Sequence, residues 1–191
     1  MDGGQRVAII DILFIIITIV WLGEFVFFKN RRVKDKKSTD TSTFPGILLS
    51  VLAVITASVF SRELAFLTFN SQLLLWTGII FYAVGVILRY WGMLKLGKQF
   101  TRDVNVTGDD EIIGTGPFRV LRHPLYTGLL SALVGISFYT GSMIGLFLTF
   151  FLFMPFLLKR IRLEEEMLVA SFGKDYEKWA ETRNKLIPFI Y

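Results

Sequence analysis

Residues 7–28 read VAIIDILFIIITIVWLGEFVFF, an apolar run that contains two charged residues, Asp11 and Glu24. A helix needs about 20 such residues to cross a hydrocarbon core of roughly 30 Å. The run is too long for the core of a signal peptide and no A-x-A cleavage pattern follows it, so it predicts a retained membrane-spanning helix.

Similar apolar blocks recur along the rest of the chain. The mean hydropathy of +0.55 and the 19 phenylalanines exclude an ordinary soluble domain. The fold class predicted is an all-α, polytopic membrane protein with about five transmembrane helices, a C-terminal helical hairpin turning at 140–142, and a cytosolic helical tail. The further blocks are 44–60, 73–94, 124–139 and 141–158.

The 191 residues form one predicted domain, in which residues 1–94 supply three spans and residues 95–191 supply a loop, the hairpin and the tail. With five spans, 18 of the 21 Lys and Arg residues fall on one side and only Arg6 and Arg62 on the other. This asymmetry predicts an N-terminus outside and a tail in the cytosol. The net charge of +5 therefore indicates contact with the lipid bilayer, and no nucleic-acid motif accompanies it.

The chain has no cysteine and one histidine. Thiolate nucleophiles, iron–sulfur clusters and zinc sites of the usual kinds are therefore excluded, and no metal is expected. Because the long polar segments lie on the predicted cytosolic side, any chemistry on polar groups is expected there.

Two charged residues inside apolar runs, Glu24 and Arg89, lie at similar predicted depth, roughly 6 to 8 Å from the cytosolic ends of their helices. We predict that they contact each other, because charges at this depth pair or face a wet cavity; the alternative is that each reaches the interface separately. Gly78, Gly85 and Gly92 recur every seven residues and predict close packing between helices.

Residues 114–128, GTGPFRVLRHPLYTG, hold the sole histidine at the start of an apolar block. Pro124 suits the first position of a helix, which places His123 at the N-cap. Free N–H groups there, beside Arg119 and Arg122, predict an anion-receiving site. The alternative is that the arginines bind lipid phosphates and His123 only caps the helix.

The tail begins with KRIRLEEEMLVASFGKDYEKW, residues 159–179, in which Gly173 marks a helix end. Neighbouring positions of a helix diverge by about 100°, so Glu164, Glu165 and Glu166 cannot all face one cavity. They either pair with nearby arginines of the same helix or fold back onto residues 114–128.

These two stretches together resemble the isoprenylcysteine carboxyl methyltransferase and phospholipid methyltransferase group of membrane enzymes, whose pattern is G-P-[YF]-R-x-x-R-H-P-x-Y, a hydrophobic hairpin, E-E and F-G-x-x-Y. The resemblance covers residues 97–191. It implies transfer of a methyl group from S-adenosylmethionine, bound on the cytosolic side, to a membrane-associated acceptor. An isoprenylcysteine-type carboxylate is favoured, since a carboxylate needs no base.

The resemblance also implies site residues. Those expected to bind the cofactor are Arg122, His123, Pro124, Tyr126, Glu164, Glu165 and Tyr176. Those expected to act in catalysis are Arg122, Glu165 and Arg183. Tyr126 additionally offers an aromatic face to a purine or a cation.

Other functions remain open at this stage. The ending FGKDYEKWAETRNKLIPFIY is also similar to membrane sterol and steroid reductases that use NADPH, and a non-enzymatic membrane scaffold is a third possibility. For a methyltransferase, the acceptor could be a lipidated carboxylate, a phospholipid amine or a small thiol.

Overall fold

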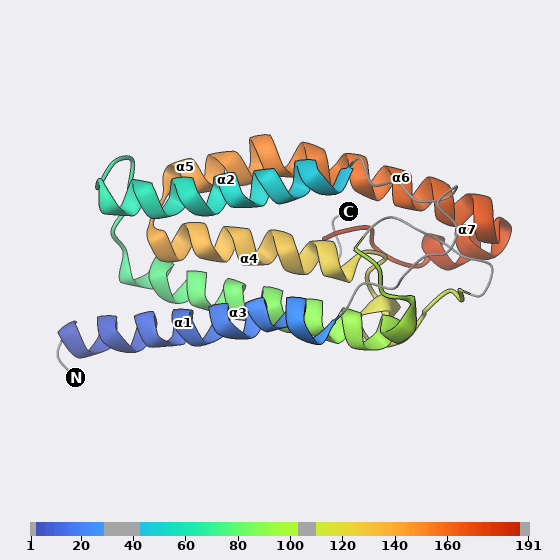
Figure 1. Ribbon diagram of the computed structural model, residues 1–191, viewed down its shortest axis with the longest axis horizontal. Coiled ribbons are helices and arrows are strands. Elements are labelled where there is room, and N and C mark those ends of the chain that lie inside the picture. Colours follow the sequence, from blue (N-terminus) through green and yellow to red (C-terminus); the bar gives the residue numbers. More distant parts are fainter. Residues whose placement is uncertain (1–2, 29–42, 103–109, 188–191) are drawn as a thin grey trace.

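The computed structural model describes residues 3–28, 43–102 and 110–187. These segments are almost entirely helical (Figure 1). The helices are α1 (Gly3–Phe27), α2 (Thr43–Glu63), α3 (Gln72–Leu96), α4 (Pro124–Thr140), α5 (Met143–Leu148), α6 (Met154–Phe172) and α7 (Lys174–Glu181), with short turns η2 (Gly97–Gln99), η3 (Gly116–Arg119) and η4 (Thr149–Phe153).

Each of the five predicted apolar blocks forms a helix, which confirms an all-α membrane protein. Within the described segments, four helices are long and apolar enough to span a membrane, and α4 is a shorter apolar helix of about 25 Å. One boundary differs from the sequence prediction, because the last block does not end at 158. Instead α5, η4 and α6 form one helix of 30 residues, Met143–Phe172.

A π turn, η4, lies inside this long helix just before Pro155. Proline lacks an N–H and crowds the preceding turn of an α-helix, and a π turn can absorb such a misfit. The helix therefore continues beyond the apolar stretch and carries the three glutamates of the tail.

Helix α4 runs through the centre of the bundle, with α3 on one side and α2 and α5 on the other (Figure 1). Its contact with α3 is backbone to backbone: a Cβ on Gly85 would lie 2.5 Å from the carbonyl oxygen of Gly128, and one on Gly78 would lie 2.5 Å from the amide nitrogen of Tyr139. The predicted packing role of these α3 glycines is thus confirmed.

The predicted hairpin turns where expected. Gly141 adopts φ 69°, a left-handed conformation that ends α4, and the side chain of Ser142 accepts a hydrogen bond from Gly145 N at 2.9 Å, which caps α5. Successive helices run in alternating directions, so the start of α1 and the end of α6 lie at opposite ends of the bundle (Figure 1). We call the end that carries α7 the tail end.

Candidate active site

The start of α4 lies at the tail end. His123 occupies the N-cap and Pro124 the first helical position, as predicted. The His123 side chain, however, makes no capping hydrogen bond. Its buried ring faces α6, where Nε2 lies 3.3 Å from Oε1 of Glu165 and Nδ1 lies 3.9 Å from Oε2 of Glu164. His123 therefore links two helices through its ring rather than closing the end of one.

The C-terminal segment, residues 183–187, covers the backbone of this helix start. The amide of Arg122 donates to the carbonyl of Asn184 at 2.8 Å, and the amide of His123 donates to the carbonyl of Lys185 at 3.3 Å. These two N–H groups are therefore occupied and are not available to the anion site that the sequence predicts beside Arg119 and Arg122. The chain itself supplies the acceptors, from more than 60 residues away in sequence.

Glu165 ties α4, α6 and the C-terminal segment together. Its Oε1 lies 3.1 Å from Nη1 of Arg122, and its Oε2 lies 2.8 Å from Nζ of Lys185. Arg122 also donates from Nε to the carbonyl of Arg183 at 3.0 Å. One carboxylate thus holds cationic side chains from two distant parts of the chain, together with the ring of His123.

Glu164 points in another direction and meets Tyr126. The Tyr126 hydroxyl donates to Oε2 of Glu164 at 2.6 Å and accepts from Nε of Arg160 at 2.8 Å. Arg160 is buried, with 5% exposure, and its Nη1 donates to the hydroxyl of Thr43 at 3.2 Å. Glu166 is exposed. The three glutamates therefore have three different surroundings, as their helical spacing predicts.

Sequence reasoning did not include Arg160 in the site. A signal for it exists, because Arg160 precedes Glu164 by four residues and so shares a helix face with it. The sequence could not show that this face meets Tyr126, which is 34 residues away.

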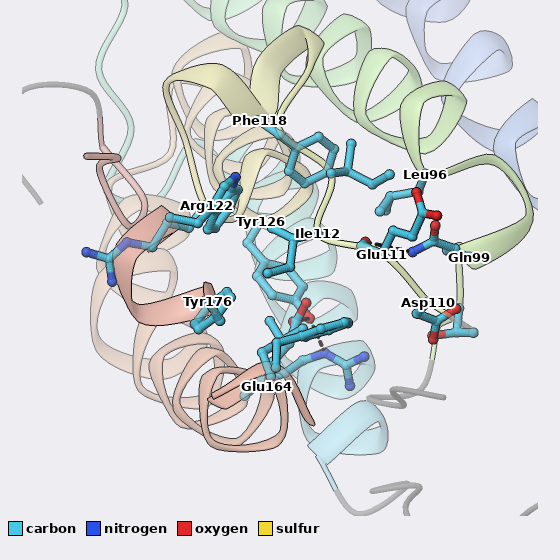
Figure 2. Close-up of a pocket in the computed structure, with 16 residues that line it drawn as sticks. Leu96, Gln99, Asp110, Glu111, Ile112, Phe118, Arg122, Tyr126, Glu164 and Tyr176 are labelled. Atoms are coloured by element: carbon cyan, nitrogen blue, oxygen red, sulfur yellow. Dashed lines mark hydrogen bonds between the residues drawn. The ribbon is translucent and has the colours of Figure 1, made fainter. Parts of the chain in front are cut away.

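A cavity opens at the tail end between the loop after α3, the start of α4, and helices α6 and α7 (Figure 2). We call it the polar cavity because ionisable side chains contribute to its lining, although more of the lining surface is apolar. The space between its protein atoms, including a part that is open to solvent, amounts to about 820 Å³. Its ionisable lining residues are Asp110, Glu111, Arg122, Arg160, Glu164 and Tyr176. In Figure 2 the side chain of Arg122 is directed away from Tyr126 and Glu164, in agreement with its bond to Glu165.

Two aromatic residues of α7 in the cavity wall carry buried polar atoms that have no hydrogen-bond partner among the described residues, namely the hydroxyl of Tyr176 and Nε1 of Trp179. The two rings stack with centroids 5.5 Å apart. Burial, and next the charges of Glu165 and Glu164, raise the pKa of Tyr176, so its hydroxyl stays a donor at neutral pH. An acceptor atom from water or from a ligand would satisfy these two donors.

A second cavity, the membrane-side cavity, lies between α1, α2, α3 and the start of α4. Apolar side chains from the spans line most of it, including Trp21, Phe25 and Val51. Seven lining residues belong to both cavities, and Tyr126, Arg160 and Glu164 are among them. The two cavities therefore meet at this hydrogen-bonded trio.

Glu165 and Arg183, both predicted to be catalytic, are not among the described residues that line either cavity. The guanidinium of Arg183 donates from Nε to the carbonyl of Phe118 at 2.8 Å and lies over the ring of Trp179, 4.6 Å from its centroid. In this position Arg183 fixes the C-terminal segment against η3.

Comparison with known proteins adds to this geometry. Residues 73–175, more than half of the chain, match the phospholipid methyltransferase family. The probable protein-S-isoprenylcysteine O-methyltransferase of Oryza sativa subsp. indica is 28% identical over 117 residues, which cover 60% of this chain and 61% of the rice protein. Protein-S-isoprenylcysteine O-methyltransferase B of Arabidopsis thaliana is 27% identical over 147 residues, which cover 76% of this chain and 73% of the Arabidopsis protein. The chain thus spans about three fifths of the rice relative.

A solved structure shares the fold. It is the eukaryotic intramembrane Ras methyltransferase ICMT, an isoprenylcysteine carboxyl methyltransferase, with a TM-score of 0.67 and 20% identity. The alignment covers 92% of this chain and 63% of that one. The correspondence therefore includes the N-terminal spans, which the sequence resemblance did not reach.

Proposed function

Because this chain belongs to the phospholipid methyltransferase family, we propose that it is an integral membrane methyltransferase that transfers a methyl group from S-adenosylmethionine to a membrane-associated acceptor. One observation carries the proposal: the polar cavity, with its ionisable side chains, and the more apolar membrane-side cavity meet at Tyr126, Arg160 and Glu164. A polar methyl donor and a lipophilic acceptor can approach each other at such a junction from opposite sides.

The polar cavity suits S-adenosylmethionine, which carries a sulfonium, an ammonium, a carboxylate and an adenosine. Carboxylates match the cationic groups and the ribose hydroxyls, whereas the guanidinium groups match its carboxylate. The donors of Tyr176 and Trp179 match acceptor atoms of the adenosine. Bound S-adenosylmethionine supplies an activated methyl group, and its transfer depends chiefly on positioning.

The protein's part in the reaction is then to orient the two reactants. Tyr126, Glu164 and Tyr176 line the polar cavity, and their role there is to bind the donor. Arg122 also lines this cavity, but its guanidinium is bonded to Glu165 and to the carbonyl of Arg183, so its role is to position the start of α4. His123, Pro124 and Glu165 shape the site by holding the start of α4 against α6. Arg183 serves the same purpose through the C-terminal segment, so we assign Glu165 and Arg183 positioning roles.

We propose an acceptor that carries a carboxylate on a lipophilic group, such as a prenylated cysteine. Four arginines and two glutamates are found in the lining of the membrane-side cavity, namely Arg89, Arg102, Arg122, Arg160, Glu24 and Glu164. The net positive lining favours an anionic acceptor over a phospholipid amine, which is itself a cation. The names of the rice and Arabidopsis relatives support the same choice.

The reductase alternative is not favoured by any of the comparisons. NADPH carries several phosphate charges, whereas three carboxylates, Asp110, Glu111 and Glu164, line the polar cavity. The amides of Arg122 and His123, just before α4, are occupied by the C-terminal segment and cannot receive a phosphate.

Ligand-dependent stability tests the choice of cofactor. S-adenosylhomocysteine, at about 100 times its dissociation constant, is expected to raise the free energy of unfolding of the detergent-solubilised protein by roughly 2.7 kcal/mol. NADPH at the same concentration is expected to leave it unchanged. Thermal unfolding measured with each ligand decides the matter, and stabilisation by NADPH alone would favour the reductase.

Membrane orientation has its own test. We propose that the N-terminus lies outside and the tail end in the cytosol, with Lys174 and Asn70 exposed at opposite ends. Because the chain contains no cysteine, single cysteines at these positions can be labelled cleanly. An impermeant thiol reagent should label the Lys174 variant only from the cytosol and the Asn70 variant only from outside. Labelling of both variants from one side contradicts the five-span topology.

A further inference from the structure

Glu24 on α1 and Arg89 on α3 form an ion pair inside the membrane-spanning part of the bundle. Nε of Arg89 lies 2.8 Å from Oε2 of Glu24, and Nη2 lies 2.5 Å from Oε1. Glu24 is 2% exposed. The contact predicted from their equal depth is confirmed, and its two-point form fixes the relative orientation of the side chains.

Helix packing alone does not account for this pair. Charges in the hydrocarbon region are costly, and a buried ion pair is often no more stabilising than apolar residues of similar volume. Small residues already bring α3 and α4 together without charge. The buried guanidinium of Arg89 therefore contributes a fixed orientation rather than stability.

Arg89 also reaches the helix that begins the active site. Its Nη1 donates to the carbonyl of Leu125 at 3.2 Å, and Leu125 lies between Pro124 and Tyr126 in the chain. The stem of Arg89 occupies space left by Gly128, where a Cβ would lie 2.7 Å from Cγ of Arg89. The pair therefore connects α1, through α3, to the first turn of α4.

Both residues line the membrane-side cavity, as do Trp21 and Phe25 on the same face of α1. The end of α1 is also held by Arg102, whose Nη2 donates to the carbonyl of Phe28 at 2.9 Å. Residues of α1 and of the first turn of α4 both line this cavity, and these polar contacts fix their relative position.

We propose that Glu24 and Arg89 are positioning residues for the acceptor: they hold α1 at a set distance from the first turn of α4 and so keep the membrane-side cavity in the shape that aligns the acceptor with the junction at Tyr126. The inference rests on the proposed function, since that function assigns the acceptor to this cavity. Loss of the pair should weaken acceptor binding and leave the polar cavity, and hence donor binding, intact.

The test compares Arg89→Gln, Glu24→Gln and the double variant with the wild type. Measured are the Michaelis constant for a farnesylated cysteine, the direct binding of the same compound, and the affinity for S-adenosylhomocysteine. Arg89→Gln is expected to raise both the Michaelis constant and the dissociation constant for the farnesylated cysteine about tenfold, as for one lost charge-assisted hydrogen bond. Donor affinity should stay within about twofold, below what such a loss produces.

Glu24→Gln keeps a hydrogen-bond acceptor of the same shape beside Arg89 and should give a smaller increase. The double variant should match Arg89→Gln rather than the product of both effects, because one interaction can be lost only once. If Arg89→Gln does not fold, Glu24→Gln still tests the inference. For Glu24→Gln we also expect a higher dissociation constant for the acceptor and an unchanged affinity for the donor.

Asp11 provides a matched control at the other end of the bundle. It accepts a hydrogen bond from Tyr139 at 2.6 Å, lies 3.8 Å from Arg62 and lines neither cavity. Asp11→Asn should lower stability without changing acceptor binding. The positioning role is overturned if Arg89→Gln and Glu24→Gln lower only stability, or if Asp11→Asn weakens acceptor binding equally.

Turnover by the wild type is a separate result. If labelled methyl from S-adenosylmethionine does not reach the farnesylated cysteine, the proposed function fails. Direct binding of the farnesylated cysteine to the wild type and the variants still tests the positioning role. Failure of the proposed function and failure of the positioning role are therefore distinguishable.

Discussion

Replacement of Glu164 by glutamine is expected to lower kcat/KM for methyl transfer on the order of 10- to 100-fold, as for the loss of one charge-assisted hydrogen bond. Glu164 accepts a hydrogen bond from the Tyr126 hydroxyl and lines both cavities, so its charge lies where the proposed donor and acceptor meet. Glutamine keeps the shape of the side chain but removes the charge that the proposed function places near the sulfonium of the donor. Steady-state kinetics with S-adenosylmethionine measure the effect.

One neighbour on the same helix makes this prediction specific. Glu166→Gln is the matched control, because Glu166 is exposed and its activity should stay within about twofold of wild type, as for a surface charge. Thermal unfolding of Glu164→Gln should change little. Equal activity of the Glu164 and Glu166 variants would show that Glu164 has no part in methyl transfer.

Glu165→Gln is expected to act first on stability, lowering the free energy of unfolding by about 1.5 to 3 kcal/mol, since charged hydrogen bonds to this carboxylate are weakened. The Glu165 carboxylate holds Arg122, His123 and Lys185. Without it the C-terminal segment is held less firmly, so donor affinity should fall together with stability. Thermal unfolding and S-adenosylhomocysteine binding measure the two effects.

Lys185→Met tests the same cluster from its other side. It removes one of the cations on Glu165 while Arg122 and His123 remain, so it should give a smaller loss of both stability and donor affinity. A Glu165→Gln variant that keeps wild-type stability but has no turnover would instead support the catalytic role that the sequence resemblance assigned to Glu165.

Features set by local sequence were predicted correctly. The five helices follow from the length of each apolar block, because a bilayer requires about 20 apolar residues per span. The hairpin at Gly141 follows from a residue that tolerates positive φ, and the contact of Glu24 with Arg89 follows from equal depth below one interface. The motifs around His123 and Glu165 identified the family without any distances.

Apart from the pair of Glu24 and Arg89, contacts between distant parts of the chain were decided only by the tertiary structure. The sequence alone could not separate the roles of Glu164 and Glu165, since helical spacing gives the angle between them but not what each one faces. For the same reason the sequence did not predict the hydrogen bond of Arg160 with Tyr126. It also did not predict that the Arg122 amide donates to the carbonyl of Asn184, 62 residues later. Apolar length and turn chemistry are local properties, whereas the partner of a polar group depends on how helices pack, and this packing brings the two cavities together at Tyr126.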